Sequence, residues 1–182
     1  MPLVSVDVQT IPIVHTEDVS SLVSDSGITR YRLEAKIWDM YSNAGDPYSY
    51  FPKGIHVEQF DSLFQITGSI VADTAYYFEK KELWQAIGNV VVKNREGRVF
   101  ETSELFWDQK APPNSMNAFY TTRLVKIVEP DGSISYGLNG FKADQSLTNI
   151  FLFKYKGEIN VVEESPDSLR QNTVRPDSIQ RP

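Results

Sequence analysis

Hydrophobic and polar residues alternate along most of this chain with a period of two residues. The longest such run covers residues 66–78, where Ala72 and Tyr76 share one face and polar residues occupy the other. Residues 88–110 add two β-branched and aromatic runs on either side of turn residues 94–97, a pattern typical of a β-hairpin. Because a period of two places alternate side chains on opposite faces of a strand, the chain is predicted to be all-β.

Two later runs are apolar at consecutive positions instead. They cover residues 117–128 and 149–155. Each run predicts a strand that is either buried on both faces or bordered by an apolar partner.

Length and composition predict a single domain. A chain of 182 residues with 41% hydrophobic content can build one substantial core, whereas two domains would be cramped. Residues 1–23 show no sustained period and are expected to form an extended lead-in, with a helical turn or an edge strand at 18–23. The β-domain is expected over residues 24–162. Residues 163–182 are rich in proline, serine, aspartate and arginine, which predicts a disordered tail.

The chain carries little that suggests catalysis or metal binding. It has no cysteine, two histidines that lie far apart in sequence (His15 and His56), and no glycine loop of the phosphate-binding type. No enzyme activity, metal site or cofactor is therefore expected. A net charge of −6 without a basic stripe argues against a nucleic-acid partner. No run approaches the ~18 apolar residues of a membrane-spanning helix.

Two stretches resemble a known family. The hairpin at 88–110 has a glycine and an asparagine opening a valine strand, then a turn, then a threonine, glutamate, leucine and tryptophan strand. The residues that carry this pattern are Gly88, Asn89, Val90, Val92, Gly97, Thr102, Glu104, Leu105, Trp107 and Asp108. The other stretch, SDSGITRYRLEA at 24–35, is followed by a Phe-Pro-Lys-Gly turn at 51–54. Together they resemble the LptC-type branch of the OstA-like family of lipopolysaccharide-transport proteins, closely over 24–110 and more loosely as far as residue 162.

The resemblance implies a twisted antiparallel β-jellyroll of stacked hairpins in one domain. It also implies a periplasmic, non-enzymatic protein that is tethered to the inner membrane by an anchor expected ahead of residue 1, and that touches the membrane only through this anchor. Its partners would be lipopolysaccharide, an inner-membrane ABC transporter complex of the LptBFG type and a periplasmic bridge protein of the LptA type. The chain would accept lipopolysaccharide from the transporter, whose ATP hydrolysis supplies the energy, and pass it to the bridge protein.

Strand alternation also predicts which side chains face the interior between the stacked hairpins. An ordinary core is the simpler explanation of such a face, and an open trough that holds acyl chains is the functional one. The two runs that are apolar at consecutive positions favour the trough. The residues predicted to line it are Leu33, Val57, Ile70, Ala72, Tyr76, Trp84, Ala86, Val90 and Val92.

A terminal edge strand is the other predicted site. The stretch 150–153 has no charge or proline to discourage pairing until Lys154 follows it, so strand addition by a partner chain is predicted here. Alternatively, the lead-in or the C-terminal tail covers this edge. The residues of the predicted edge are Ile150, Phe151, Leu152, Phe153 and Tyr155.

Two other functions stay open at the level of sequence. A secreted β-sandwich could bind carbohydrate or another protein at its surface, with sugars stacking on Tyr48, Tyr50 and Phe51. A structural adaptor with closed troughs would bind no lipid.

Overall fold

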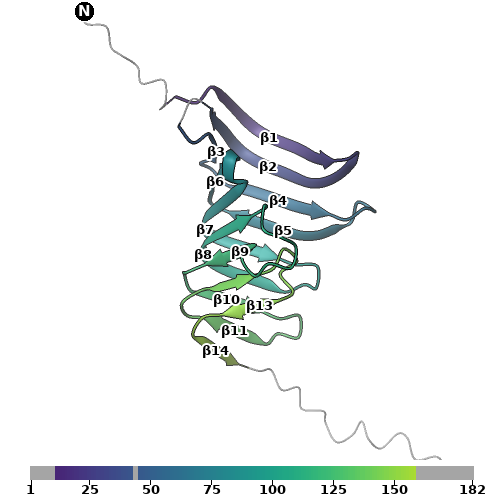
Figure 1. Ribbon diagram of the computed structural model, residues 1–182, viewed down its shortest axis with the longest axis vertical. Coiled ribbons are helices and arrows are strands. Elements are labelled where there is room, and N and C mark those ends of the chain that lie inside the picture. Colours follow the sequence, from purple (N-terminus) through teal and green to yellow (C-terminus); the bar gives the residue numbers. More distant parts are fainter. Residues whose placement is uncertain (1–10, 43–44, 159–182) are drawn as a thin grey trace, which may run out of the picture.

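The chain is almost entirely β-structure in the computed structural model, which describes residues 11–42 and 45–158 (Figure 1). In these residues fourteen strands form one antiparallel sheet, and a 3-10 turn, Glu79–Lys81, follows the sixth strand. The strands are β1 (Val14–Asp25), β2 (Ile28–Tyr41), β3 (Tyr48–Phe51), β4 (Ile55–Phe60), β5 (Ile66–Ala72), β6 (Thr74–Phe78), β7 (Leu83–Lys93), β8 (Val99–Asp108), β9 (Phe119–Thr121), β10 (Val125–Val128), β11 (Ile134–Gly137), β12 (Phe141–Ala143), β13 (Ile150–Leu152) and β14 (Tyr155–Glu158). The predicted all-β, jellyroll-like single domain is confirmed.

Three long strands fold this sheet into two walls. The first half of β7 pairs with β6, and its second half pairs with β5. Strands β2 and β8 are divided between neighbours in the same way. The first wall thus runs β2-β3-β6-β7-β8-β9-β12-β13, and the second runs β2-β4-β5-β7-β8-β10-β11-β14. The two walls are joined along the margin at which β2, β7 and β8 bend. At the opposite margin, each wall ends in turns between strands.

The bend in β7 depends on a cluster around Asp73. The Asp73 N–H donates to the Gly88 carbonyl (2.9 Å), and the Gly54 N–H donates to the Asp73 carbonyl (2.7 Å). Asn89 Nδ2 donates to the Asp73 carboxylate at 2.8 Å. Gly88 and Asn89 have φ values of +77° and +42°, and a Cβ on Gly88 would lie 2.6 Å from Asp73 Oδ2. The glycine at this position is therefore required by both conformation and space.

This cluster corrects one sequence prediction. Residues 66–78 form two strands, β5 and β6, because the chain turns at Asp73. The alternation changes phase there, so that Ala72 and then Ala75 are buried in the interior. Tyr76 consequently lies on the outer face, where its ring stacks on Tyr50 with centroids 4.6 Å apart. The prediction that Tyr76 faces the interior is wrong.

The two runs that are apolar at consecutive positions also prove to be divided between walls. Residues 117–128 contain β9 in the first wall and β10 in the second, and residues 149–155 contain β13 and the start of β14. The chain crosses between walls at 122–124, and Leu124 in this crossing is 52% exposed. The prediction that each run forms a single strand buried on both faces is therefore wrong, because the consecutive apolar residues belong to different strands.

The N-terminal boundary lies earlier than expected. Residues 14–25 form β1, which pairs with β2 along nearly its whole length, so the sheet begins before residue 24. Of the two expectations for 18–23, the edge strand is correct. The predicted tail at 163–182, together with 159–162, lies outside the described residues.

Candidate functional site

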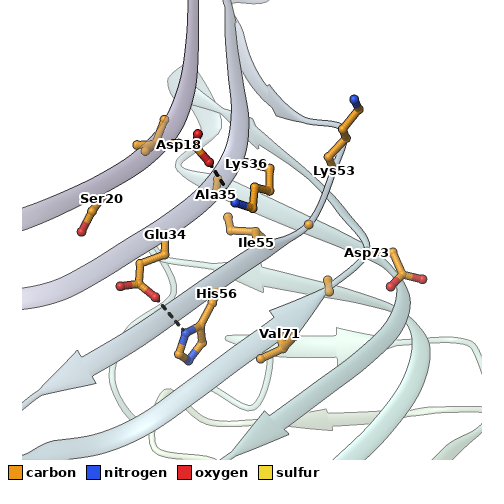
Figure 2. Close-up of a pocket in the computed structure, with 13 residues that line it drawn as sticks. Asp18, Ser20, Glu34, Ala35, Lys36, Lys53, Ile55, His56, Val71 and Asp73 are labelled. Atoms are coloured by element: carbon orange, nitrogen blue, oxygen red, sulfur yellow. Dashed lines mark hydrogen bonds and ion pairs between the residues drawn. The ribbon is translucent and has the colours of Figure 1, made fainter.

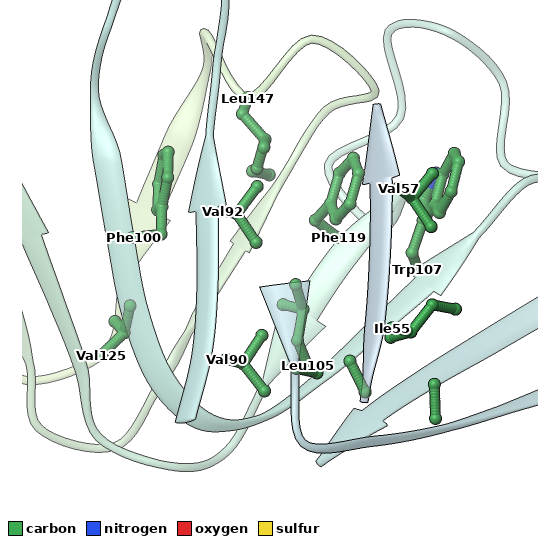
Figure 3. Packing of buried hydrophobic residues seen from close by; sticks show 14 of the residues in the cluster. Ile55, Val57, Val90, Val92, Phe100, Leu105, Trp107, Phe119, Val125 and Leu147 are labelled. Carbon is green, nitrogen blue, oxygen red and sulfur yellow. The ribbon is translucent and has the colours of Figure 1, made fainter. Parts of the chain in front are cut away.

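The space between the two walls is the candidate site, and an uninterrupted row of apolar side chains runs through it. In the second wall, strand register places these side chains opposite one another on successive strands, from β2 to β10. The row consists of Leu33, Val57, Ile70, Val92, Phe100 and Ile127. Figure 3 shows part of this packing, with Val92 between Phe100 and Val57. Burial of each such side chain contributes about 1.5–3 kcal/mol to folding.

Aromatic rings fill the matching part of the first wall. Phe51 stacks on both Trp38 and Trp84, with centroids 5.7 Å apart in each case. The column continues through Trp107, 6.5 Å from Trp84, to Phe119, 5.5 Å further on. The interior is thus apolar along both walls.

The predicted lining residues, apart from Tyr76, all lie in this interior. Ile70 and Trp84 are half-buried and pack against the core, while the others are buried in it. The others are Leu33, Val57, Ala72, Ala86, Val90 and Val92. Whether any of them contacts lipid stays a prediction.

The interior is closely packed in this structure. One cavity of about 20 Å³ lies between Ile55, Ala75 and Leu105, and another of about 40 Å³ lies beside Leu147. Ligand sites usually hold about 300–1,000 Å³. The open trough expected from sequence is therefore not present between the described parts of the walls, because their side chains interdigitate.

Residues 144–149, which we call the strap, bridge the two walls on the side of the hairpin turns. Asn94 Nδ2, in the β7–β8 turn of the second wall, donates to the Leu147 carbonyl at 3.1 Å. On the first wall, Trp107 Nε1 donates to Gln145 Oε1 at 2.9 Å, and Gln145 Nε2 donates to the Asp108 carbonyl at 2.8 Å. The strap therefore holds the two walls together in the C-terminal half of the sheet.

Asp144 organises the strap from within. Its buried carboxylate accepts hydrogen bonds from Ser146 Oγ (3.0 Å), the Thr148 N–H (3.0 Å) and Asn149 Nδ2 (2.6 Å). Burial alone would raise the pKa of this carboxyl, but the hydrogen bonds, led by that from Asn149, outweigh burial and leave the pKa below its ordinary value. The strap is thus most stable when Asp144 is ionised.

Leu147 is the apolar plug of the strap. Its side chain is 4% exposed and lines the larger interior cavity. Its backbone has φ +55°, in the left-handed region that costs a residue with a Cβ about 1–2 kcal/mol. Sequence reasoning missed the strap, although aspartate and serine, which begin it, are both turn-forming residues.

Trp38 and Trp84 carry an unusual feature within this apolar interior. The Nε1 atoms of both are buried and have no hydrogen-bond partner in the part of the chain that the structure describes. Trp107, in contrast, donates to Gln145. Sequence alternation could place these rings on a face, but it could not show which of them lack an acceptor.

At the C-terminal end of the described sheet, the last strand of each wall is an edge strand, and the two strands follow one another in sequence. β13 pairs with β12, β14 pairs with β11, and the Phe153 N–H between them donates to the Gly140 carbonyl at 3.0 Å. Of the predicted edge residues, Phe151 is 52% exposed, Phe153 and Tyr155 are also exposed, and Ile150 and Leu152 pack partly against the core. β1 lies at the opposite end of the sheet (Figure 1), so the described part of the expected lead-in does not cover this edge.

The aromatic residues considered for sugar stacking are arranged unfavourably. Phe51 is 1% exposed and belongs to the core, so its prediction as a surface residue is wrong. Tyr48 stacks on Tyr41 at 4.7 Å, and Tyr50 stacks on Tyr76. These rings cover one another as cross-strand pairs, which leaves less ring face for a sugar.

A shallow groove of about 670 Å³ follows the outer face of β1, β2, β4 and β5 (Figure 2). Several of its polar side chains pair with one another: Lys36 Nζ lies 2.9 Å from Asp18 Oδ1, and His56 Nδ1 lies 3.4 Å from Glu34 Oε2. The groove therefore has the character of a solvated sheet surface.

Comparison with known proteins gives no assignment: no model of a known family matches the chain, and no curated protein matches it. Within residues 11–42 and 45–158, no three histidine, cysteine or acidic side chains come together in a way that could hold a metal ion. The same residues contain no helix with the length and hydropathy to span a bilayer.

Proposed function

We propose that this chain is a non-enzymatic lipopolysaccharide-binding and transfer protein of the periplasm. It would receive lipopolysaccharide from an inner-membrane ABC transporter complex and pass it to an LptA-type bridge protein of similar fold. The observation that carries the proposal is the apolar row that continues from β2 to β10 between walls that are joined by strands along one margin only. The sequence resemblance over 24–110 supplies the identity of the lipid and of the partners.

Lipid entry in this proposal separates the walls at the margin that carries the turns. The bends in β2, β7 and β8 act as the hinge, because the strand hydrogen bonds there are continuous. Each acyl methylene that enters gains about 0.8 kcal/mol by leaving water, and it replaces wall-to-wall contacts of similar apolar character. The closed interior is then the lipid-free state, and transfer requires a continuous apolar path more than a high affinity.

The edge at 150–158 provides the route to the next protein. Within the described part of the chain, each of its strands is paired on one side, β13 with β12 and β14 with β11. A partner strand added there would prolong both walls and extend the apolar row across the junction. Strand addition at this edge is part of the proposal.

A structural adaptor that never binds lipid is the second candidate, and the filled interior favours it. The two candidates differ in whether the interior row is ever reached by lipid. Carbohydrate binding by stacking is not proposed, because Phe51 is buried and because Tyr48 and Tyr50 stack on neighbouring tyrosines.

A pair of neighbouring positions tests the proposal. Ile70 lies in the interior row, whereas Val71 follows it on the outer face and is 43% exposed. A photo-crosslinking residue at Ile70 is expected to capture lipopolysaccharide in cells that carry out lipopolysaccharide export, and the same residue at Val71 is not. Equal capture at both positions, or capture at neither by folded protein, would reject lipid transport between the walls. Capture of a protein chain at Phe151 would report the edge separately.

A further inference from the structure

Among the residues that the structure describes, two buried side-chain hydrogen-bond donors lack an acceptor. Indole Nε1–H groups donate and cannot accept, and at least nine in ten buried polar groups in proteins are paired. Leaving such a donor buried and unpaired destabilises the folded state. Trp38 and Trp84 both carry this cost in the described structure, on rings that stack on the same Phe51. A phenylalanine at either position would keep the stacking and avoid the cost.

Water does not supply the missing acceptor at Trp84. This ring lines the cavity of about 20 Å³, whose other lining residues are all apolar. They are Ile55, Val57, Ile70, Ala75, Ala86, Leu105 and Trp107, the last of which has its own indole N–H already bound to Gln145. A buried water needs about two to four polar partners, and a cavity of this kind stays dry. An acceptor has to arrive on a molecule that is itself largely apolar.

We propose that the indole N–H groups of Trp38 and Trp84 bind the carbonyl oxygens of the ester or amide linkages that join acyl chains to the head of a lipid. This inference rests on the proposed function, because it requires acyl chains to enter between the walls. The carbonyl is the first strong acceptor along such a chain, so it follows the methylenes into the interior. The two tryptophans then fix how deeply the chains lie, and they favour acylated lipids over lipids that lack carbonyl groups.

The three tryptophans of the chain provide a direct test with an internal control. In ¹⁵N-labelled protein, each indole N–H gives one resonance. Addition of purified lipopolysaccharide is expected to move the indole proton resonances of Trp38 and Trp84 downfield, as a new hydrogen bond requires. The Trp107 resonance is expected to stay closer to its position, because its donor is already bound to Gln145.

Conservative variants test whether these bonds contribute to binding. A net hydrogen bond of about 0.5–1.5 kcal/mol corresponds to roughly two- to twelvefold in affinity. Trp38→Phe and Trp84→Phe are each expected to weaken binding of a diacyl phosphatidylcholine by that factor, and to leave binding of its diether analogue unchanged. Trp107→Phe is the matched control, and any loss it causes is expected to be the same for both lipids.

The outcomes separate this inference from the function on which it rests. Wild-type protein that binds neither lipopolysaccharide nor phospholipid would overturn both. Lipopolysaccharide binding that leaves the Trp38 and Trp84 resonances in place, or equal losses of ester and ether lipid in the phenylalanine variants, would overturn this inference and leave lipid transport standing.

Discussion

Replacement of Leu147 gives the sharpest test of the strap. Leucine-to-alanine changes in cores cost about 2–5 kcal/mol, and Leu147 is almost fully buried. Its φ of +55° adds a second effect, since glycine adopts this conformation without the roughly 1–2 kcal/mol that a Cβ costs. Leu147→Ala is therefore expected to lower the free energy of unfolding by about 2–4 kcal/mol. Leu147→Gly is expected to be less harmful than alanine by roughly 1 kcal/mol, the reverse of the usual order.

Urea unfolding at equilibrium measures both changes. Leu124→Ala is the matched control, because this leucine is exposed and its loss is expected to change stability by less than about 0.5 kcal/mol. A second measurement uses an apolar dye whose fluorescence rises in apolar surroundings. Removal of the plug is expected to raise dye fluorescence in Leu147→Ala under conditions in which the protein is still folded, and Leu124→Ala is expected to leave it unchanged.

Two results would refute the reasoning. A glycine variant less stable than the alanine variant would mean that the left-handed conformation of Leu147 is not the relevant one. Equal dye uptake by wild type and a folded Leu147→Ala variant would mean that the strap does not guard the interior.

Two further predictions concern the folded state. Gly140→Ala would place a Cβ 2.0 Å from the Thr121 carbonyl oxygen at φ +94°, so it is expected to cost more than about 3 kcal/mol. Gly27→Ala, at φ +80° with nothing within 4 Å, is expected to cost only about 1–2 kcal/mol; equal urea midpoints for the two variants would contradict the close approach. The pKa of Asp144 is lowered by folding, so its stabilisation is present above the ordinary value of 3.8 and is lost as the pH falls through the lowered value. Wild type is thus expected to be more stable than Asp144→Asn at neutral pH, with the unfolding free energies converging below about pH 4; a pH-independent difference would contradict this.

Local pattern predicted the faces of the strands well where the alternation keeps its phase along the chain. In β7, alternation correctly placed Trp84, Ala86, Val90 and Val92 in the interior, because the number of residues across the bend at Gly88 and Asn89 leaves the alternation in phase. It failed at Tyr76, because the phase of β6 is set by the turn at Asp73 and by backbone bonds to Gly54 and Gly88, which lie elsewhere in the sequence. Gly88 and Asn89 form a recognisable motif in the sequence, but a sequence motif does not specify their φ values or their contact with Asp73.

The sequence by itself determined that the chain forms β-strands, which side chains share a face within each strand, and where most turns fall. These properties depend on neighbours within a few residues, and a period of two reports them. Only the tertiary structure decided that the walls close on each other, that the strap joins them, and that two indole donors lack acceptors. Such features depend on contacts between distant segments, such as that between Asn94 and Leu147, which are 53 residues apart. A pattern that describes one strand at a time carries no information about which surfaces meet.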